Sequence, residues 1–99
     1  MKYTSYHSVD ITSNIETLTP ALGEPLFQDL NAVDDKVQIE YEIKLPNGKE
    51  VYLYSWKEYR RLNKSSYIDF HIGARSRQES LEARDYINSL ITKSRNPKQ

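Results

Sequence analysis

The residues in this chain whose side chains are best suited to bind a ligand are a histidine and two arginines at the start of a predicted helix. They lie in the segment His71-Ile72-Gly73-Ala74-Arg75-Ser76-Arg77. A strand would lead through Gly73 to a helix N-terminus, where free amides and guanidinium groups can hold a phosphate or a carboxylate. Alternatively, Ser76 and Glu79 cap the helix themselves, which is the commoner use of such residues. The candidate anion-binding residues are His71, Arg75, Ser76 and Arg77.

Aromatic and basic residues are interleaved in a second segment, from Tyr54 to Lys64. Rings beside cations are typical of single-stranded nucleic-acid platforms, and Trp, Tyr and Arg also dominate protein-binding hot spots. The most common arrangement for such a sequence buries Tyr54 and Trp56 in a hairpin core and leaves the cations on a solvated turn. The candidate binding residues, for protein or nucleic acid, are Trp56, Lys57, Tyr59, Arg60, Arg61 and Lys64.

Catalytic and metal-binding motifs are absent from the sequence. No serine lies between glycines in a strand-turn-helix elbow, and the three glycines are too scattered for a phosphate-binding or dinucleotide-binding loop. There is no cysteine, and neither His7 nor His71 has a neighbour at metal-ligand spacing. We therefore expect no enzymatic activity, no cofactor and no metal.

The composition predicts one domain over residues 1–99. A chain of 99 residues that is 37% apolar builds a single core, and its eight tyrosines supplement the aliphatic residues. No stretch resembles a signal peptide or approaches the roughly 20 apolar residues that span a bilayer. We expect a cytoplasmic protein with no membrane partner.

The net charge is zero, but the charges are unevenly distributed. Residues 1–50 carry nine acids and four bases, whereas residues 51–99 carry five acids and ten bases. This asymmetry could steer a charged partner to one face. Equally, the acidic half could lie over the basic half and neutralise it.

The clearest structural signal is a β-hairpin. Apolar and polar residues alternate from Lys36 to Leu45, the pattern of a half-buried strand. Asn47-Gly48 favours a two-residue turn, so a second strand should run from about Glu50 to Trp56. This turn predicts a register that places Tyr52, Tyr54 and Trp56 on the same face as three alternate residues of the first strand, Ile39, Tyr41 and Ile43.

The remaining elements complete an α+β domain. A helical turn and loop should follow over residues 57–66, then a third strand from Tyr67 to Ile72 that ends at Gly73, with Ile68, Phe70 and Ile72 facing inward. Ser76 and Glu79 form a capping box for a helix starting at Arg77 and fraying near Lys93, with residues 94–99 disordered. Its buried stripe should be Ala83, Tyr86, Ile87, Leu90 and Ile91.

Residues 1–35 show no lasting period, and we expect short helices and irregular chain wrapping the core. Ser13 could cap a short helix that ends before Pro20. Pro25 could start another helical turn carrying Leu26, Phe27 and Leu30.

Five short motifs together resemble small uncharacterised bacteriophage-encoded proteins, and the similarity covers residues 22–90. The motifs are Leu22-Gly23-Glu24-Pro25, the Lys36–Leu45 strand, Asn47-Gly48, Tyr54-Ser55-Trp56-Lys57 and Phe70-His71-Ile72-Gly73. Such proteins have no known activity that the resemblance could assign to this chain. The resemblance implies a context in which small proteins in the host cytoplasm bind and redirect a host protein.

Three functions follow as hypotheses. The first is a non-enzymatic interaction protein that binds and modulates or inhibits a host bacterial protein, and that could act as a homodimer through a sheet edge or aromatic face. The second is a nucleic-acid-binding module, although a net charge of zero disfavours it. The third is a binder of a small phosphorylated ligand at the helix N-terminus. The nucleic-acid module would use the cations Lys57, Arg60, Arg61, Lys64, Arg75 and Arg77.

Overall fold

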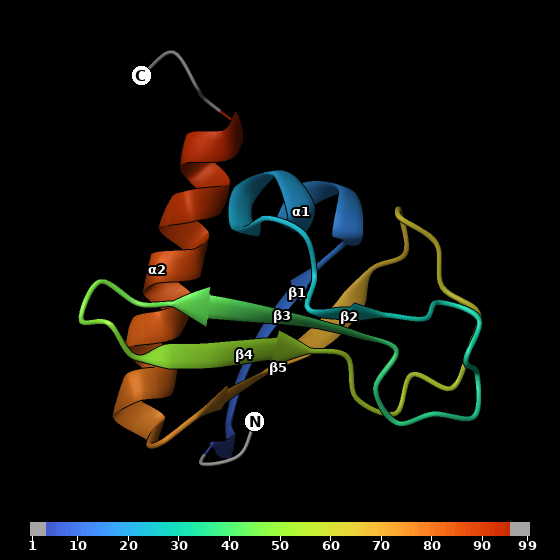
Figure 1. Cartoon of the computed structure of the whole chain (residues 1–99), viewed down its shortest axis with the longest axis horizontal. Helices are drawn as coiled ribbons and strands as arrows, with labels where there is room; N and C mark the ends of the chain where they lie inside the picture. The colour runs from blue at the N-terminus through green and yellow to red at the C-terminus, as the bar shows by residue number, and fades with distance from the viewer. Residues whose placement is uncertain (1–3, 96–99) are drawn as a thin grey trace.

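The computed structural model describes residues 4–95 and shows a five-stranded antiparallel sheet with two helices against one face (Figure 1). The spatial order of the strands is β1-β5-β4-β3-β2. The predicted α+β class is confirmed, including the packing of the C-terminal helix on the sheet. In chain order the elements are β1 (Ser5–Ser13), α1 (Ile15–Leu22), β2 (Phe27–Gln28), β3 (Ile39–Lys44), β4 (Glu50–Tyr54), β5 (Ile68–Ala74) and α2 (Arg77–Arg95).

The hairpin forms as predicted, but its register differs by one residue. Gly48 N donates to the Leu45 carbonyl (2.9 Å) and Leu45 N to the Lys49 carbonyl (2.8 Å), so the loop has three residues. Pro46 suits the second position of such a turn, and Gly48, at φ 87°, takes the left-handed conformation that closes it. Tyr41 therefore pairs with Leu53 rather than Tyr54.

This shift exchanges the two faces of β4. Val51 and Leu53 now face the helices together with Ile39, Tyr41 and Ile43, and all five are buried. The predicted burial of the β4 aromatics beneath the last helix is wrong, because Tyr52 and Tyr54 point to the opposite face. The main core contains no β4 aromatic and is built around Tyr41 and Phe70, whose rings meet edge to face at 6.3 Å.

The N-terminal segment is a strand rather than irregular chain. β1 pairs with β5 at the edge of the sheet, and Val9, Ile11 and Ser13 face inward. A bulge between Tyr6 and Asp10, with Ser8 at φ 63°, interrupts the alternation. Since a bulge inserts an extra residue, it hides the period of two that marks a strand in a sequence.

The short helix predicted after Ser13 is present, but its cap and its end differ from the prediction, and the helical turn predicted after Pro25 is absent. Helix α1 is capped by Asn14 rather than Ser13, because the Asn14 side chain accepts from Thr17 N (2.9 Å). The helix also continues through Pro20 to Leu22, with Gly23 as its C-cap. The segment after Pro25 is not helical, since Phe27 and Gln28 form the edge strand β2 beside β3.

Other boundaries also shift. The first hairpin strand begins at Ile39, three residues after the predicted start at Lys36, and residues 57–66 contain no helical turn. Gly73 lies inside β5, between Tyr6 and Tyr52, rather than ending the strand. The inward positions of β5 are confirmed.

Helix α2 begins at Arg77 as predicted, with Glu79 N donating to Ser76 Oγ (3.1 Å). The helix continues to Arg95, beyond the predicted fraying at Lys93, and residues 96–99 of the predicted disordered tail lie outside the described part. Most of its predicted buried stripe is confirmed, since Ala83 and Ile87 are fully buried and Tyr86 and Ile91 pack against the core. Leu90, the fifth predicted member, is only half-buried and does not join the core. Neither helix of residues 4–95 has the length and apolarity needed to cross a membrane.

Candidate functional site on the open sheet face

A row of side chains crosses all five strands on the face opposite the helices. The pairings place Phe27, Glu40, Tyr54, His71 and Asp10 side by side, from β2 to β1. Both helices lie on the other side of the sheet (Figure 1). We call this surface the open face. It also includes Tyr6, Thr12, Glu42, Tyr52, Trp56 and Asp69.

Four rings form a packed cluster on the open face. Tyr6 stacks on His71, with ring centroids 3.8 Å apart and planes 11° from parallel. Tyr54 meets His71 edge to face at 5.7 Å and Trp56 at 6.2 Å. Gly73, which has no side chain, lies between Tyr6 and Tyr52 in the sheet. Tyr54 lies between the rings of His71 and Trp56 and is only 5% exposed, although it is outside the main core.

Carboxylates surround these rings. The Tyr6 hydroxyl donates to Asp10, and Thr12 Oγ1 donates to Asp69 Oδ1 (3.2 Å). The hydrogen bond to Asp10 raises the pKa of Tyr6 to about 12. Burial and then the neighbouring Asp10 raise the pKa of Asp69, while burial followed by Glu40 and Asp10 raises that of Tyr54. These directions indicate a negative potential over the open face.

Asp69→Asn is expected to stabilise the protein at neutral pH by roughly 0.5 kcal/mol, a small gain because the group is exposed to solvent. The pKa of Asp69 is raised in the folded state, so the wild-type free energy of unfolding falls as the pH rises through the carboxyl range. The gain from the variant should therefore vanish in acid, where the aspartates are protonated. Urea denaturation of both proteins from about pH 3 to about pH 7 measures this difference, and a gain that is constant with pH contradicts it.

Trp56 lies at the other end of the ring cluster, beside two cations. The ammonium groups of Lys36 and Lys57 lie 5.9 and 5.7 Å from the centre of its ring. Lys57 and Tyr59 both adopt positive φ, 54° and 49°. Each such residue costs about 1–2 kcal/mol, so the surrounding structure must hold the loop in place.

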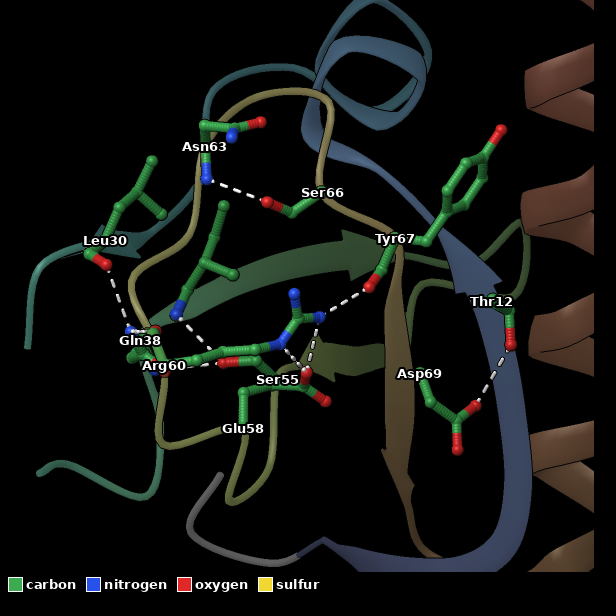
Figure 2. Close-up of polar contacts among 11 residues, drawn as sticks. Thr12, Leu30, Gln38, Ser55, Glu58, Arg60, Asn63, Ser66, Tyr67 and Asp69 are labelled. Carbon is green, nitrogen blue, oxygen red and sulfur yellow. Dashed lines mark hydrogen bonds and ion pairs between the residues drawn. The ribbon is translucent and has the colours of Figure 1, made fainter. Parts of the chain in front are cut away.

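Hydrogen bonds hold this loop against the residues that immediately precede β3 and β5, as Figure 2 shows. Gln38 Nε2 donates to the carbonyls of Leu30 (3.1 Å) and Arg60 (2.8 Å). The Arg60 guanidinium donates to the Tyr67 carbonyl (2.6 Å) and pairs with Glu58 (2.8 Å). Arg60 thus has partners within the chain and holds the loop.

The predicted binding residues do not share one surface. Trp56 and Lys57 join the open face, and Tyr59 and Arg61 are exposed farther along the loop. Lys64 lines a separate groove of about 380 Å³, beside Glu16 and Pro20 of α1. Their roles in binding stay predictions, and the structure groups Trp56 with residues that the sequence analysis did not select.

The predicted anion-binding residues are also separated. Glu79 Oε1 accepts from Arg75 N (3.0 Å) and from its guanidinium (2.7 Å), where an anion would bind. Burial opposes ionisation of Glu79, but these bonds from Arg75 keep its pKa below the ordinary value. In the predicted capping box Glu79 accepts from the Ser76 amide, whereas in the structure it accepts from the Arg75 amide instead. Arg77 donates to the His7 carbonyl (3.0 Å), and His71 lies on the open face.

Several residues of the site were missed by sequence reasoning. Tyr6 and Asp10 lie in the strand hidden by the bulge, and Glu40 and Tyr54 were placed on different faces by the wrong register. The signal that was available is the alternation of Asp10 and Thr12 with Val9, Ile11 and Ser13. Within residues 4–95, no three His, Asp or Glu side chains gather as a metal site would require.

No protein-family model, curated protein or solved structure matches this chain. The candidate function therefore has to be inferred from the geometry and charge of the open face.

Proposed function

We propose that this chain is a non-enzymatic interaction protein that binds a partner protein through its open face. The observation that carries the proposal is the cluster of Tyr6, Tyr54, Trp56 and His71 on the side of the sheet without helices. Tyr and Trp are enriched in binding hot spots because they bury much area with little loss of side-chain entropy. The exposed Leu26 and Phe27 extend an apolar contact surface at the β2 edge.

The loop after β4 supports the same proposal. Strained, non-glycine residues with positive φ cluster at functional sites, and Lys57 and Tyr59 flank Glu58 beside Trp56. The hydrogen bonds of Gln38 and Arg60 hold this loop before any partner arrives. Such preorganisation lowers the entropy lost on binding.

The structure gives less support to nucleic-acid binding. Phosphates would meet Glu40, Asp10 and Asp69 on the same face as the rings. Three of the six cations considered for this role, Arg60, Arg75 and Arg77, donate to groups within the chain. A protein partner avoids this repulsion, because its surface can offer cations.

The resemblance to small bacteriophage proteins supports the further proposal that the partner belongs to a bacterial host. In that setting the partner is a protein of the bacterial cytoplasm, and binding modulates or inhibits it. The aromatic cluster supports the binding step, and the identity of the host protein is open to experiment.

Affinity capture from a bacterial lysate tests this function, with Trp56→Ala as the key variant. Loss of a central hot-spot tryptophan costs 2 kcal/mol or more, so the captured protein should bind at least about 30-fold more weakly. Asn88→Ala, on the exposed side of α2, is the matched control and should capture the protein as well as wild type does. Circular dichroism establishes that both variants are folded.

Nuclease treatment separates the alternatives. A captured protein that remains after nuclease treatment and is lost with Trp56→Ala supports the proposal. Capture that depends on nucleic acid, or that is unchanged in Trp56→Ala, contradicts it.

A further inference from the structure

We infer that the segment that binds the open face is basic and carries arginine. Its guanidinium groups would lie against the carboxylates of Asp10 and Asp69 and the neighbouring rings of Tyr6 and Tyr54. This inference rests on the proposed function and adds the chemistry of the partner.

The strand positions of the open face carry mainly negative charge, whereas the cations of Lys36 and Lys57 lie at its Trp56 end. Among the outward positions of strands β1–β5, five carry a carboxylate and one, Lys44, carries an ammonium group. Arg75 reaches the Glu50 carbonyl at the rim of this face, but it already pairs with Glu79. The outward carboxylates are those of Asp10, Glu40, Glu42, Glu50 and Asp69.

Within residues 4–95, none of these carboxylates forms an ion pair with a lysine or an arginine. The ion pairs found within residues 4–95 join Arg60 to Glu58 and Arg75 to Glu79, so none connects the acidic half to the basic half. The raised pKa of Tyr6 and Asp69 agrees with an excess of negative charge near Asp10. These carboxylates are therefore open to complementary charge from a partner.

Arginine suits this surface better than lysine does. A guanidinium is planar, binds a carboxylate through two parallel hydrogen bonds and stacks on aromatic rings. The Trp56 end of the cluster already holds the cations of Lys36 and Lys57. At the Asp10 end, the hydroxyl groups of Tyr6 and Thr12 donate to the two aspartates, which also lie within hydrogen-bonding distance of each other. A partner's arginine would supply the cation there.

A second copy of the chain fits this face poorly. Symmetric pairing would place the same carboxylates opposite one another, which is destabilising. Nucleic acid meets the same repulsion through its phosphates. A basic protein segment meets both the charge and the aromatic character of the face.

The test is an NMR titration of the full chain, labelled with ¹⁵N, with a nona-arginine peptide at low salt. Amide shifts should centre on β1 and β5 around Asp10 and His71, and they should weaken as salt is added. The double variant Asp10→Asn/Asp69→Asn should bind about tenfold more weakly, because two partly exposed ion pairs are lost. Asp85→Asn, a charge removal on the exposed side of α2, should leave the affinity unchanged.

Three parallel ligands make the test selective. Nona-lysine should bind more weakly than nona-arginine, and nona-glutamate and oligothymidine should leave the open face unshifted. Equal binding of lysine and arginine, shifts confined to another surface, tighter binding of oligothymidine, or concentration-dependent shifts of the open face without peptide would each overturn the inference.

Failure of this inference is distinguishable from failure of the proposed function. If nona-arginine leaves the open face unshifted while Trp56→Ala still abolishes protein capture, the interaction function stands and the basic partner is rejected. If nona-arginine leaves the open face unshifted and Trp56→Ala captures protein as well as wild type does, the basic partner and the proposed function are both rejected.

Discussion

Phe70→Ala is expected to lower the free energy of unfolding by about 3–5 kcal/mol, the largest effect in this protein. Phe70 is completely buried in β5, at the centre of the helix-facing core, and its ring contacts that of Tyr41. The substitution removes the burial of a large ring and leaves a cavity. Since domains of this size are stable by about 5–15 kcal/mol, the loss would remove a large share of the stability.

Urea denaturation followed by circular dichroism measures this loss. Tyr67→Ala is the matched control, because Tyr67 is an aromatic residue just before the same strand and is 71% exposed. Its stability should stay within about 0.5 kcal/mol of wild type. Similar losses in the two variants would show that Phe70 does not lie at the centre of the core.

Ser55→Ala is expected to cost about 2–4 kcal/mol, because it leaves two buried backbone amides without an acceptor. Ser55 Oγ accepts from Gln38 N (2.9 Å) and Ile39 N (3.2 Å), and the serine is fully buried. These bonds hold the start of β3 against the end of β4 (Figure 2). Trp56 follows Ser55 directly in the chain. The variant should therefore also loosen the open face.

Hydrogen exchange distinguishes this local effect from a general loss of stability. Exchange should accelerate most at residues 36–39 and 56–62 in Ser55→Ala. Ser66→Ala is the control, since Ser66 accepts a single bond, from Asn63 N (2.9 Å), in an exposed turn where water can replace it. Unchanged exchange near Gln38 in Ser55→Ala would contradict the assigned role.

The elements with an unbroken period were predictable from the sequence. The alternation around Tyr41, the outward position of His71 and the buried stripe through Ala83 and Ile87 all appear in the structure. In each case the local pattern and the tertiary burial agree, because one face of the element meets the core.

The hairpin register was harder to predict, because two rules compete at one turn. Asn47-Gly48 favours a two-residue loop, whereas Pro46 at the preceding position favours a three-residue loop closed by Gly48. The aromatic residues favoured the first choice only on the assumption that they belong to the core. In the structure Val51 and Leu53 fill that position, and the aromatic residues form a second cluster outside it.

The candidate site depends on contacts between distant parts of the chain. Tyr6 and His71 are separated by most of the sequence, and their stacking requires β1 to pair with β5 across a bulge. No local pattern encodes that pairing. The sequence did indicate Trp56 and His71 as residues of interest, but not that they share a surface with Asp10.

Ser8, whose backbone is in the left-handed conformation, also limits the addition of further strands at the β1 edge of the sheet. A straight nine-residue border strand would offer a template on which further chains could assemble, as in fibrils. The kink at Ser8 splits β1 into two short lengths with different registers. Neither length offers the long flat run that templated assembly needs, so the same irregularity that brings Tyr6 over His71 guards the chain against aggregation.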